Sequence, residues 1–192
     1  MVSEVNAMKV QMKLIEDVIF GNGQSIPGEE DISVLCDDHG FPYYKGSTFK
    51  GIFREELQRL LDWKKITKDD REKLVTRLLG KSDSISGSAS LVFSDYVISD
   101  SVKERVLSEL SDADEIRKAF TSLRTFTKID EDGMVQDGSL RIARCVNKGI
   151  TLHGEIACDP ADEGLVGEVL GMMKWVGTMR NRGFGKVLVE GE

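Results

Sequence analysis

Cysteine, histidine and proline are scarce in this sequence of 192 residues. The three cysteines, Cys36, Cys145 and Cys158, form no CxxC pair, which argues against a structural zinc site and against a disulfide framework. We therefore expect reduced thiols and a cytoplasmic protein. Only His39 and His153 are available for histidine chemistry, and no motif singles out either of them.

Long apolar runs and familiar phosphate-binding motifs are also missing. No apolar stretch approaches the roughly 18 residues of a membrane span, and residues 1–12 alternate instead of forming a signal core, so we expect neither a membrane segment nor secretion. The sequence contains no GxxxxGK[ST] loop, and no helical pattern follows Gly21–Gly23. Because aromatic residues make up only 7% of the chain, stacking on many bases is not expected.

The net charge of −7 argues at first sight against a nucleic-acid partner. The charges are nevertheless segregated along the chain. Residues 45–54, 117–128 and 174–186 carry Lys and Arg with no acidic residue, whereas residues 29–38 carry five acidic residues and no basic one. Any one basic window is compatible with an ordinary solvated face, but three of them favour phosphate binding.

The hydrophobic pattern predicts an α+β protein with a mostly antiparallel sheet. Alternation over residues 7–20 predicts a first strand, and helical periodicity follows from residue 52 onward. A second helix is expected over residues 67–80, with Thr67 as its N-cap. The remaining predictions are strands at 89–98, 121–129, 139–147, 149–157 and 186–189, a charged helix or loop at 101–119 and a helix at 161–173.

Residues 45–51, KGSTFKG, precede the first predicted helix directly. This order places Ser47, Thr48 and several backbone N–H groups at a helix N-terminus, which is a favourable position for a phosphate. An ordinary N-cap by Ser47 or Thr48 explains the same residues. Both interpretations stay open from the sequence.

Four segments, taken in order, resemble the RAMP superfamily of CRISPR proteins. Residues 41–57, FPYYKGSTFKGIFREEL, are similar to the family pattern G-x-P-Y-I-P-G-S-S-L-K-G-x-x-R. Residues 89–98, ASLVFSDYVI, resemble A-x-L-x-F-x-D-A, and residues 124–140 resemble R-x-x-I-x-x-x-x-G-x-x-x-x-G-x-L. Residues 176–187, VGTMRNRGFGKV, resemble the glycine-rich loop G-x-x-R-S-R-G-F-G-R-V.

The best-fitting subgroup is the repeating backbone subunit of type III CRISPR effector complexes. The resemblance implies one modified ferredoxin-like or RRM-like domain over residues 1–192, with insertions near 63–88 and 99–120 and a thumb-like hairpin near 124–140. It also implies guide RNA, target RNA, other effector subunits and further copies of the chain as partners. The expected RNA contacts are Lys45, Ser47, Thr48, Lys50, Arg54, Arg124, Lys128, Arg180, Arg182, Gly183, Gly185 and Lys186.

An acidic loop carries the catalytic position of this resemblance. In active members, an Asp in the pattern G-G-I-D-x-P-V-x-x-D-x-x-G-x-P-Y cleaves target RNA with a divalent metal, and residues 29–43, EEDISVLCDDHGFPY, place Asp31 there. The chain departs from the pattern at Glu29, Glu30 and Ser33. Asp31, with Glu29, Glu30 or Asp37 nearby, is thus a candidate ligand for a cation such as magnesium, and a merely solvated acidic loop is the alternative.

Two other functions within the same superfamily remain open. One is a repeat-processing endoribonuclease, which is metal-independent and needs a side chain that acts as general acid or base. This chain has only two histidines for that role. The other is a capping subunit of the effector complex without catalysis.

Overall fold

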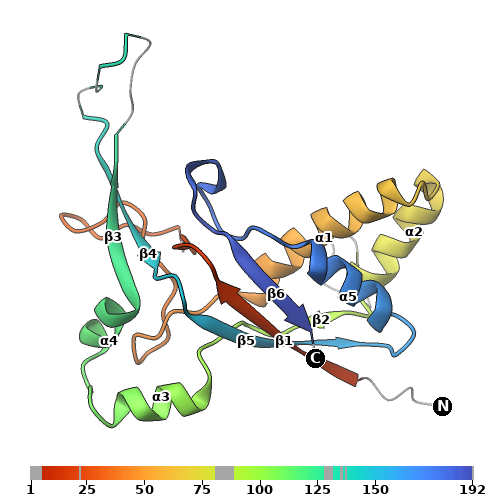
Figure 1. Ribbon diagram of the computed structural model, residues 1–192, viewed down its shortest axis with the longest axis horizontal. Coiled ribbons are helices and arrows are strands. Elements are labelled where there is room, and N and C mark those ends of the chain that lie inside the picture. Colours follow the sequence, from red (N-terminus) through yellow and green to blue (C-terminus); the bar gives the residue numbers. More distant parts are fainter. Residues whose placement is uncertain are drawn as a thin grey trace.

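A four-stranded antiparallel sheet forms the body of the protein in its computed structural model, which describes residues 6–21, 23–80, 89–127, 132–134, 136 and 138–191 (Figure 1). The strand order is β2-β5-β1-β6. The bounds are Asn6–Leu14 for β1, Val92–Phe93 for β2, Thr151–Cys158 for β5 and Val187–Gly191 for β6. β1 lies at the centre because it pairs with β5 on one side and with β6 on the other.

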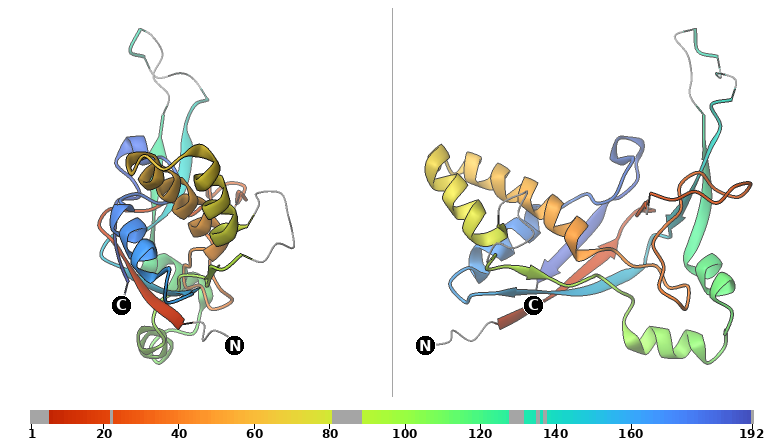
Figure 2. Two further views of the ribbon diagram at one scale, coloured as in Figure 1. Left: turned by 90° about the vertical axis from the view of Figure 1, so that its right-hand side faces the viewer. Right: turned by 180° about the vertical axis from the view of Figure 1, so that it is seen from behind.

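Three helices cover one face of this sheet (Figures 1 and 2): α1, Gly46–Trp63; α2, Lys68–Leu79; and α5, Glu163–Met172. The period-2 pattern of β1 turns Val10, Met12 and Leu14 toward the helices, where all three are buried. On α1, Phe49 and Phe53 are buried among the aromatic rings of Phe93 and Tyr96. The core therefore lies between the helical layer and one face of the sheet.

The order of elements is that of a ferredoxin-like β-α-β-β-α-β fold with insertions, so the predicted α+β class is confirmed. The long insertion lies between β2 and β5 and contains α3, Asp100–Leu107; α4, Ala113–Phe120; and a separate two-stranded sheet. The strands of that sheet, β3 (Thr121–Phe126) and β4 (Arg141–Val146), form a hairpin that projects from the body (Figure 1).

Backbone pairing along the edge of β4 that faces away from β3 joins the hairpin to the rest of the protein. Val18 and Val146 exchange two N–H···O bonds of 2.9 and 2.8 Å, and Ile32 forms a parallel bridge with Ala143. The paired strands begin at Thr121 and end at Val146, outside the 124–140 limits expected from the sequence. Lys128 lies outside the described residues.

Two predicted strands are shorter in the structure than in the sequence pattern. β1 ends at Leu14, because the backbone of Ile15 and Glu16 then donates to the carbonyl of Lys186. The 89–98 segment forms a ladder only at Val92–Phe93 and continues as single bridges, including Tyr44–Tyr96. None of the described helices is long and apolar enough to cross a membrane.

Substitutions of two aromatic residues on α1 test this core. Phe49 is fully buried against Tyr96, with ring centroids 4.3 Å apart, whereas the side chain of Trp63 is 79% exposed. We predict that Phe49→Ala lowers the free energy of unfolding by about 3–5 kcal/mol, and that Trp63→Ala changes it by less than about 0.5 kcal/mol. Urea denaturation followed by circular dichroism measures both, and equal losses would contradict the assigned core.

Candidate nucleic-acid interface

The N-terminus of α1 is occupied by a carboxylate of the chain itself. Lys45 is the N-cap residue, and the Gly46 N–H donates to Oδ1 of Asp95 at 2.8 Å. The predicted capping by Ser47 or Thr48 is therefore wrong, although both side chains are exposed at this end of the helix. Because Asp95 already supplies a negative charge, it competes with any phosphate at this helix end.

Lys50 and Arg54 lie one turn apart on α1, as the sequence predicts, but their surroundings differ. The Arg54 guanidinium donates to the carbonyls of Leu79 and Gly80, both at 3.1 Å, and thereby caps the C-terminus of α2. Lys50 is half-buried, and burial together with the nearby Arg54 charge lowers the pKa of its ammonium. Arg54 thus has a structural role beside any contact with RNA.

The glycine-rich loop between α5 and β6 presents two arginines to solvent. Arg180–Arg182 forms a short 3-10 turn, and both arginines are exposed. Gly183 has a φ of 83°, and a Cβ built there meets no described atom within 4 Å. Gly185 has a φ of 84°, but its Cβ would lie 2.1 Å from the Val176 carbonyl oxygen. Gly185 is therefore required by a close contact with the backbone of the chain itself, at Val176, whereas Gly183 borders open space.

This loop meets the hairpin at the last pair of the β3–β4 ladder, Phe126 with Arg141, which we call the hairpin base because residues 127–140 continue from it. The Arg182 guanidinium lies 5.9 Å from the centroid of the Phe126 ring on β3, and Phe126 packs edge-on against Phe184 with centroids 5.4 Å apart. A cavity of about 550 Å³ lies between the two segments. Its lining combines basic, aromatic, apolar and polar residues: Phe126, Thr127, Gln136, Gly138, Ser139, Arg141, Met179 and Arg182.

Arg124, also on β3, is held in an ion pair. Its guanidinium contacts Oδ2 of Asp17 at 2.6 Å, and this hydrogen bond raises the pKa of Arg124. Because the Arg124 side chain is 52% exposed, the pair contributes little to stability and leaves the arginine accessible. Lys186 is likewise exposed at the start of β6, where its carbonyl accepts from Ile15 and Glu16.

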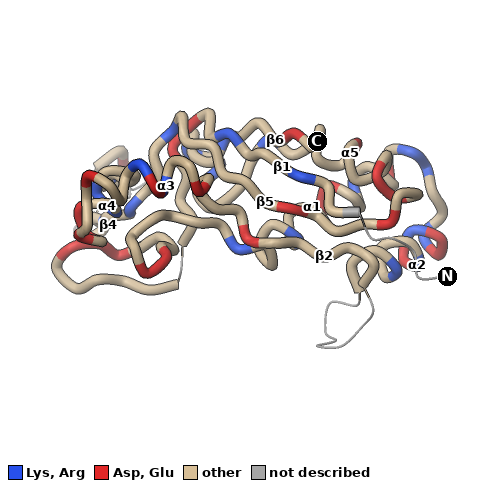
Figure 3. The backbone as a smooth tube through the Cα atoms, turned by 90° about the horizontal axis from the view of Figure 1, so that it is seen from below, with Lys and Arg blue, Asp and Glu red and all other residues tan. Residues whose placement is uncertain are grey.

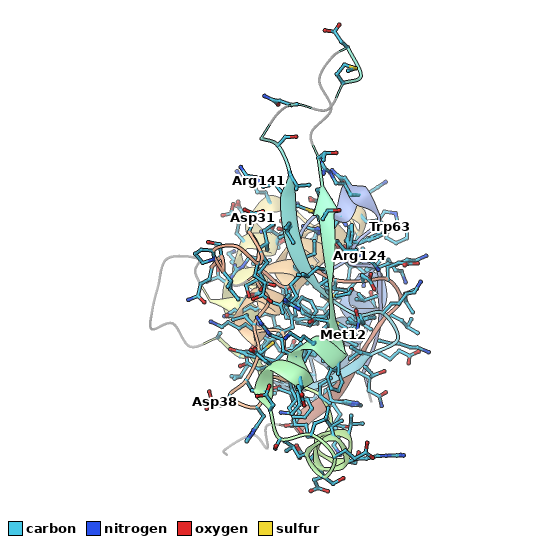
Figure 4. All side chains as sticks on the ribbon, turned by 90° about the vertical axis from the view of Figure 1, so that its left-hand side faces the viewer. Met12, Asp31, Asp38, Trp63, Arg124 and Arg141 are labelled. Atoms are coloured by element: carbon cyan, nitrogen blue, oxygen red, sulfur yellow. The ribbon has the colours of Figure 1, made fainter. Side chains whose placement is uncertain are left out.

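Asp31 lies beside β4 of the hairpin, next to Arg141 (Figure 4). Its Oδ2 accepts from the Ile142 N–H at 2.8 Å, and its Oδ1 lies 3.6 Å from a guanidinium nitrogen of Arg141. The side chain remains 42% exposed. One carboxylate is therefore held at the base of the hairpin with access to solvent.

The other acidic residues of the loop are engaged elsewhere. Glu29 and Glu30 pair with Arg117 and Arg144, and Asp37 pairs with Lys103 at 2.8 Å. Within the described residues, no group of three or more His, Cys, Asp or Glu side chains is arranged to hold a metal. Asp31 alone fits a cation shared with RNA phosphates and water, which is how magnesium is commonly held, but not one caged by the protein.

Folding also pairs charges that the sequence separates. Arg117, from a basic window, meets Glu29, Glu30 and Asp114, so part of that window is neutralised. Seen from below, both signs are interspersed along the length of the molecule (Figure 3). Arg124 and Arg141 on the hairpin and Arg180, Arg182 and Lys186 on the glycine-rich loop stay exposed.

The described strand residues on the sheet face opposite the helices include no Phe, Tyr or Trp, and the one ring among them is the imidazole of His153. These residues are Ala7, Lys9, Gln11, Lys13, Val92, Thr151, His153, Glu155, Ala157, Leu188 and Glu190. RRM domains stack bases on aromatic residues of their sheet. In this chain the arginines and the aromatic ring of the candidate interface lie instead at the hairpin and the loop.

Sequence reasoning missed Phe126, Arg141 and Met179 at this interface. Phe126 lies within the predicted thumb at 124–140 and Arg141 directly follows it, so their positions in the sequence were an available signal. Met179 has a positive φ of 57° and comes directly before Arg180, but no sequence pattern marks it.

The fold and this basic, hairpin-bearing interface are those of a modified ferredoxin-like domain with a projecting thumb. The sequence model of the RAMP superfamily matches residues 11–188, and the chain belongs to this superfamily.

Two solved structures are similar over nearly the whole chain. One is a cryo-EM structure of a type III-B Cmr-beta complex bound to cognate target RNA, with a TM-score of 0.69, 13% sequence identity and 97% of each chain covered. The other is the apo state of type III-B Cmr-beta, with a TM-score of 0.71, 13% identity and 96% of each chain covered. At this identity the likeness shows a shared fold. No curated protein matches the chain by sequence.

The two glycines of the loop provide a matched test. We predict that Gly183→Ala costs about 1 kcal/mol of unfolding free energy, because only the positive φ is strained. Gly185→Ala should cost about 3 kcal/mol or more, because its Cβ also collides with the Val176 backbone. Denaturation curves compare the two variants, and a larger loss for Gly183→Ala would contradict the loop geometry.

Proposed function

We propose that this chain is a guide-RNA-binding backbone subunit of a type III CRISPR effector complex and cleaves target RNA with the aid of Asp31. The single observation that carries the proposal is the cavity between the hairpin and the glycine-rich loop. It joins Phe126, Arg141 and Arg182 at one place, with Asp31 beside Arg141. Membership of the superfamily and the fold shared with Cmr structures support the same assignment.

Phosphate contacts are the first task of such a site. Arg180, Arg182 and Lys186 present exposed charges on the loop, and Arg124 and Arg141 present theirs on the hairpin. Guanidinium groups suit phosphates because two parallel N–H donors match two oxygens. The protein then contacts RNA backbone, while sequence specificity comes from base pairing between guide and target.

Cleavage requires charge neutralisation at the reacting phosphate. Asp31 would hold a divalent cation such as magnesium together with RNA oxygens, and the cation would supply this neutralisation. The Ile142 N–H fixes one carboxylate oxygen of Asp31, and Arg141 places a positive charge beside the other. The chain's own contribution is therefore to orient one carboxylate at the base of the hairpin.

Contacts with other subunits are proposed for the acidic part of the insertion. The residues of α3 are exposed or only partly buried, and residues 100–115 carry six acidic residues against Lys103 and Arg105. Such a surface suits basic surfaces of neighbouring subunits, including further copies of the chain. The likeness to chains of Cmr complexes supports this assembly.

Substituting two aspartates of the same loop one at a time distinguishes a catalytic role of Asp31 from a general effect of losing negative charge. We predict that Asp31→Ala in the purified guide-loaded complex lowers target-RNA cleavage by at least about 100-fold, the scale of losing a group that acts in the transition state. Asp38→Ala should leave the rate within about twofold, because its exposed side chain is distant from the hairpin base (Figure 4).

The assay measures product formation with and without a metal chelator. Cleavage that survives both Asp31→Ala and chelation would contradict the catalytic part of the proposal and favour a non-catalytic subunit. Cleavage of a CRISPR repeat hairpin by the isolated chain in chelator would instead favour the repeat-processing enzyme.

Salt dependence tests the RNA path separately from catalysis. The double variant Arg180→Ala/Arg182→Ala should weaken binding of single-stranded RNA and reduce the slope of log K against log salt by about 1.4, for two lost phosphate contacts. The control Lys73→Ala/Arg105→Ala removes the same charge from α2 and α3 and should leave the slope unchanged. Equal slopes for both double variants would place the RNA elsewhere.

A further inference from the structure

We propose that Arg144 and Glu30 are positioning residues that hold Asp31 at the base of the hairpin. This inference rests on the proposed function and deepens it, because it names side chains that would set the geometry of the cleavage site without touching RNA. The sequence pattern marks neither residue for this role.

Arg144 has an unusual number of partners for a buried side chain. It is only 3% exposed and projects from β4. Its Nε donates to Oε2 of the fully buried Glu30, one terminal nitrogen donates to Oε1 of Glu29 at 2.7 Å, and the other donates to Oγ1 of Thr121 at 3.1 Å. One guanidinium therefore ties the acidic loop, β3 and β4 together.

A second arginine completes the cluster from α4. Arg117 lies 3.6 Å from Oε1 of Glu30 and 3.4 Å from Oε1 of Glu29, and its carbonyl accepts from the Thr121 hydroxyl at 2.6 Å. Buried charges are tolerated only when they are paired, and removing one partner leaves the other uncompensated. The cluster thus holds Glu29 and Glu30 in one place.

The backbone carries this restraint directly to Asp31. The Arg144 N–H donates to the Ile32 carbonyl at 2.9 Å, and the Asp31 N–H donates to the Ile142 carbonyl at 2.8 Å. Asp31 and Ile32 consequently run beside β4, which Ile32 meets in an isolated parallel bridge to Ala143. Asp31 lies between a buried anchor at Glu30 and a backbone bridge at Ile32, so its carboxylate keeps a defined position relative to the hairpin.

Arg144→Lys tests the inference while keeping the charge. A lysine ammonium has no planar fork and cannot serve three acceptors in the same geometry. We expect target-RNA cleavage at saturating target to fall by about 10- to 100-fold, the range seen when outer-shell partners of a metal ligand are lost. Guide and target affinities should stay within about twofold, since Arg144 is buried away from the RNA-binding surface.

Glu30→Gln is the milder second variant, because it removes the charge of the buried partner and keeps its shape. It should reduce cleavage in the same direction, and hydrogen exchange of the Ile32, Ile142 and Arg144 amides should accelerate in both variants. Adding Arg144→Lys to Asp31→Ala should cause no further loss of cleavage if Arg144 acts through Asp31.

Arg77→Lys is the matched control. Arg77 forms a comparable two-bond pair with Asp162, at 2.8 and 2.7 Å, between α2 and the start of α5. Because Arg77 is 52% exposed, this variant should change stability only slightly, and it should leave cleavage at saturating target and amide exchange at Ile142 unchanged. A similar fall in cleavage for Arg77→Lys would show a general structural effect and overturn the positioning role.

The outcomes separate the two proposals. If wild-type cleavage does not depend on Asp31, the catalytic part of the proposed function fails, and amide exchange still reports whether Arg144 holds the loop. If cleavage depends on Asp31 but Arg144→Lys changes neither the rate nor amide exchange, the positioning role fails and the proposed function stands.

Discussion

The buried contact between Arg144 and Glu30 joins the projecting hairpin to the acidic loop at residues 29–38. Removing two charges from water is costly, and only close, multiple hydrogen bonds compensate for that cost. Arg144 meets this requirement through Glu29, Glu30 and Thr121. This one guanidinium ties the loop that carries Asp31 to both strands of the hairpin. The candidate site is therefore built on a strand and its neighbours instead of on a free loop.

Net charge is a poor guide to partners for this chain because the fold redistributes its charges. Acidic residues of the 29–38 segment neutralise Arg117 and Arg144, and Asp17 pairs with Arg124. The charges left exposed beside the cavity are mainly arginines of the hairpin and the glycine-rich loop. A chain with a formal charge of −7 thus presents a local basic surface, which suits the proposed RNA partner.

Local patterns in the sequence correctly predicted features that depend on neighbouring residues, such as helix caps and the buried face of a strand. Thr67 caps α2 as expected, with its hydroxyl accepting from the Asp70 N–H, and the period-2 residues of β1 are buried as expected. Contacts between residues far apart in the sequence carried no such signal. Asp95 accepts from the Gly46 N–H at the start of α1, 49 positions away, and Arg54 donates to the Leu79 carbonyl at the end of α2, 25 positions away. Asp31 was singled out by resemblance, whereas Arg144 joins the site only through the fold.

Photo-crosslinking to RNA tests the central claim most directly, because it asks which surface the RNA occupies. A photoreactive side chain at Thr127 lies in the cavity between the hairpin and the glycine-rich loop, and one at Leu188 lies on the sheet face opposite the helices. We predict RNA adducts from position 127 in the guide-loaded complex and none from position 188. Adducts from position 188 with none from position 127 would contradict the proposed interface.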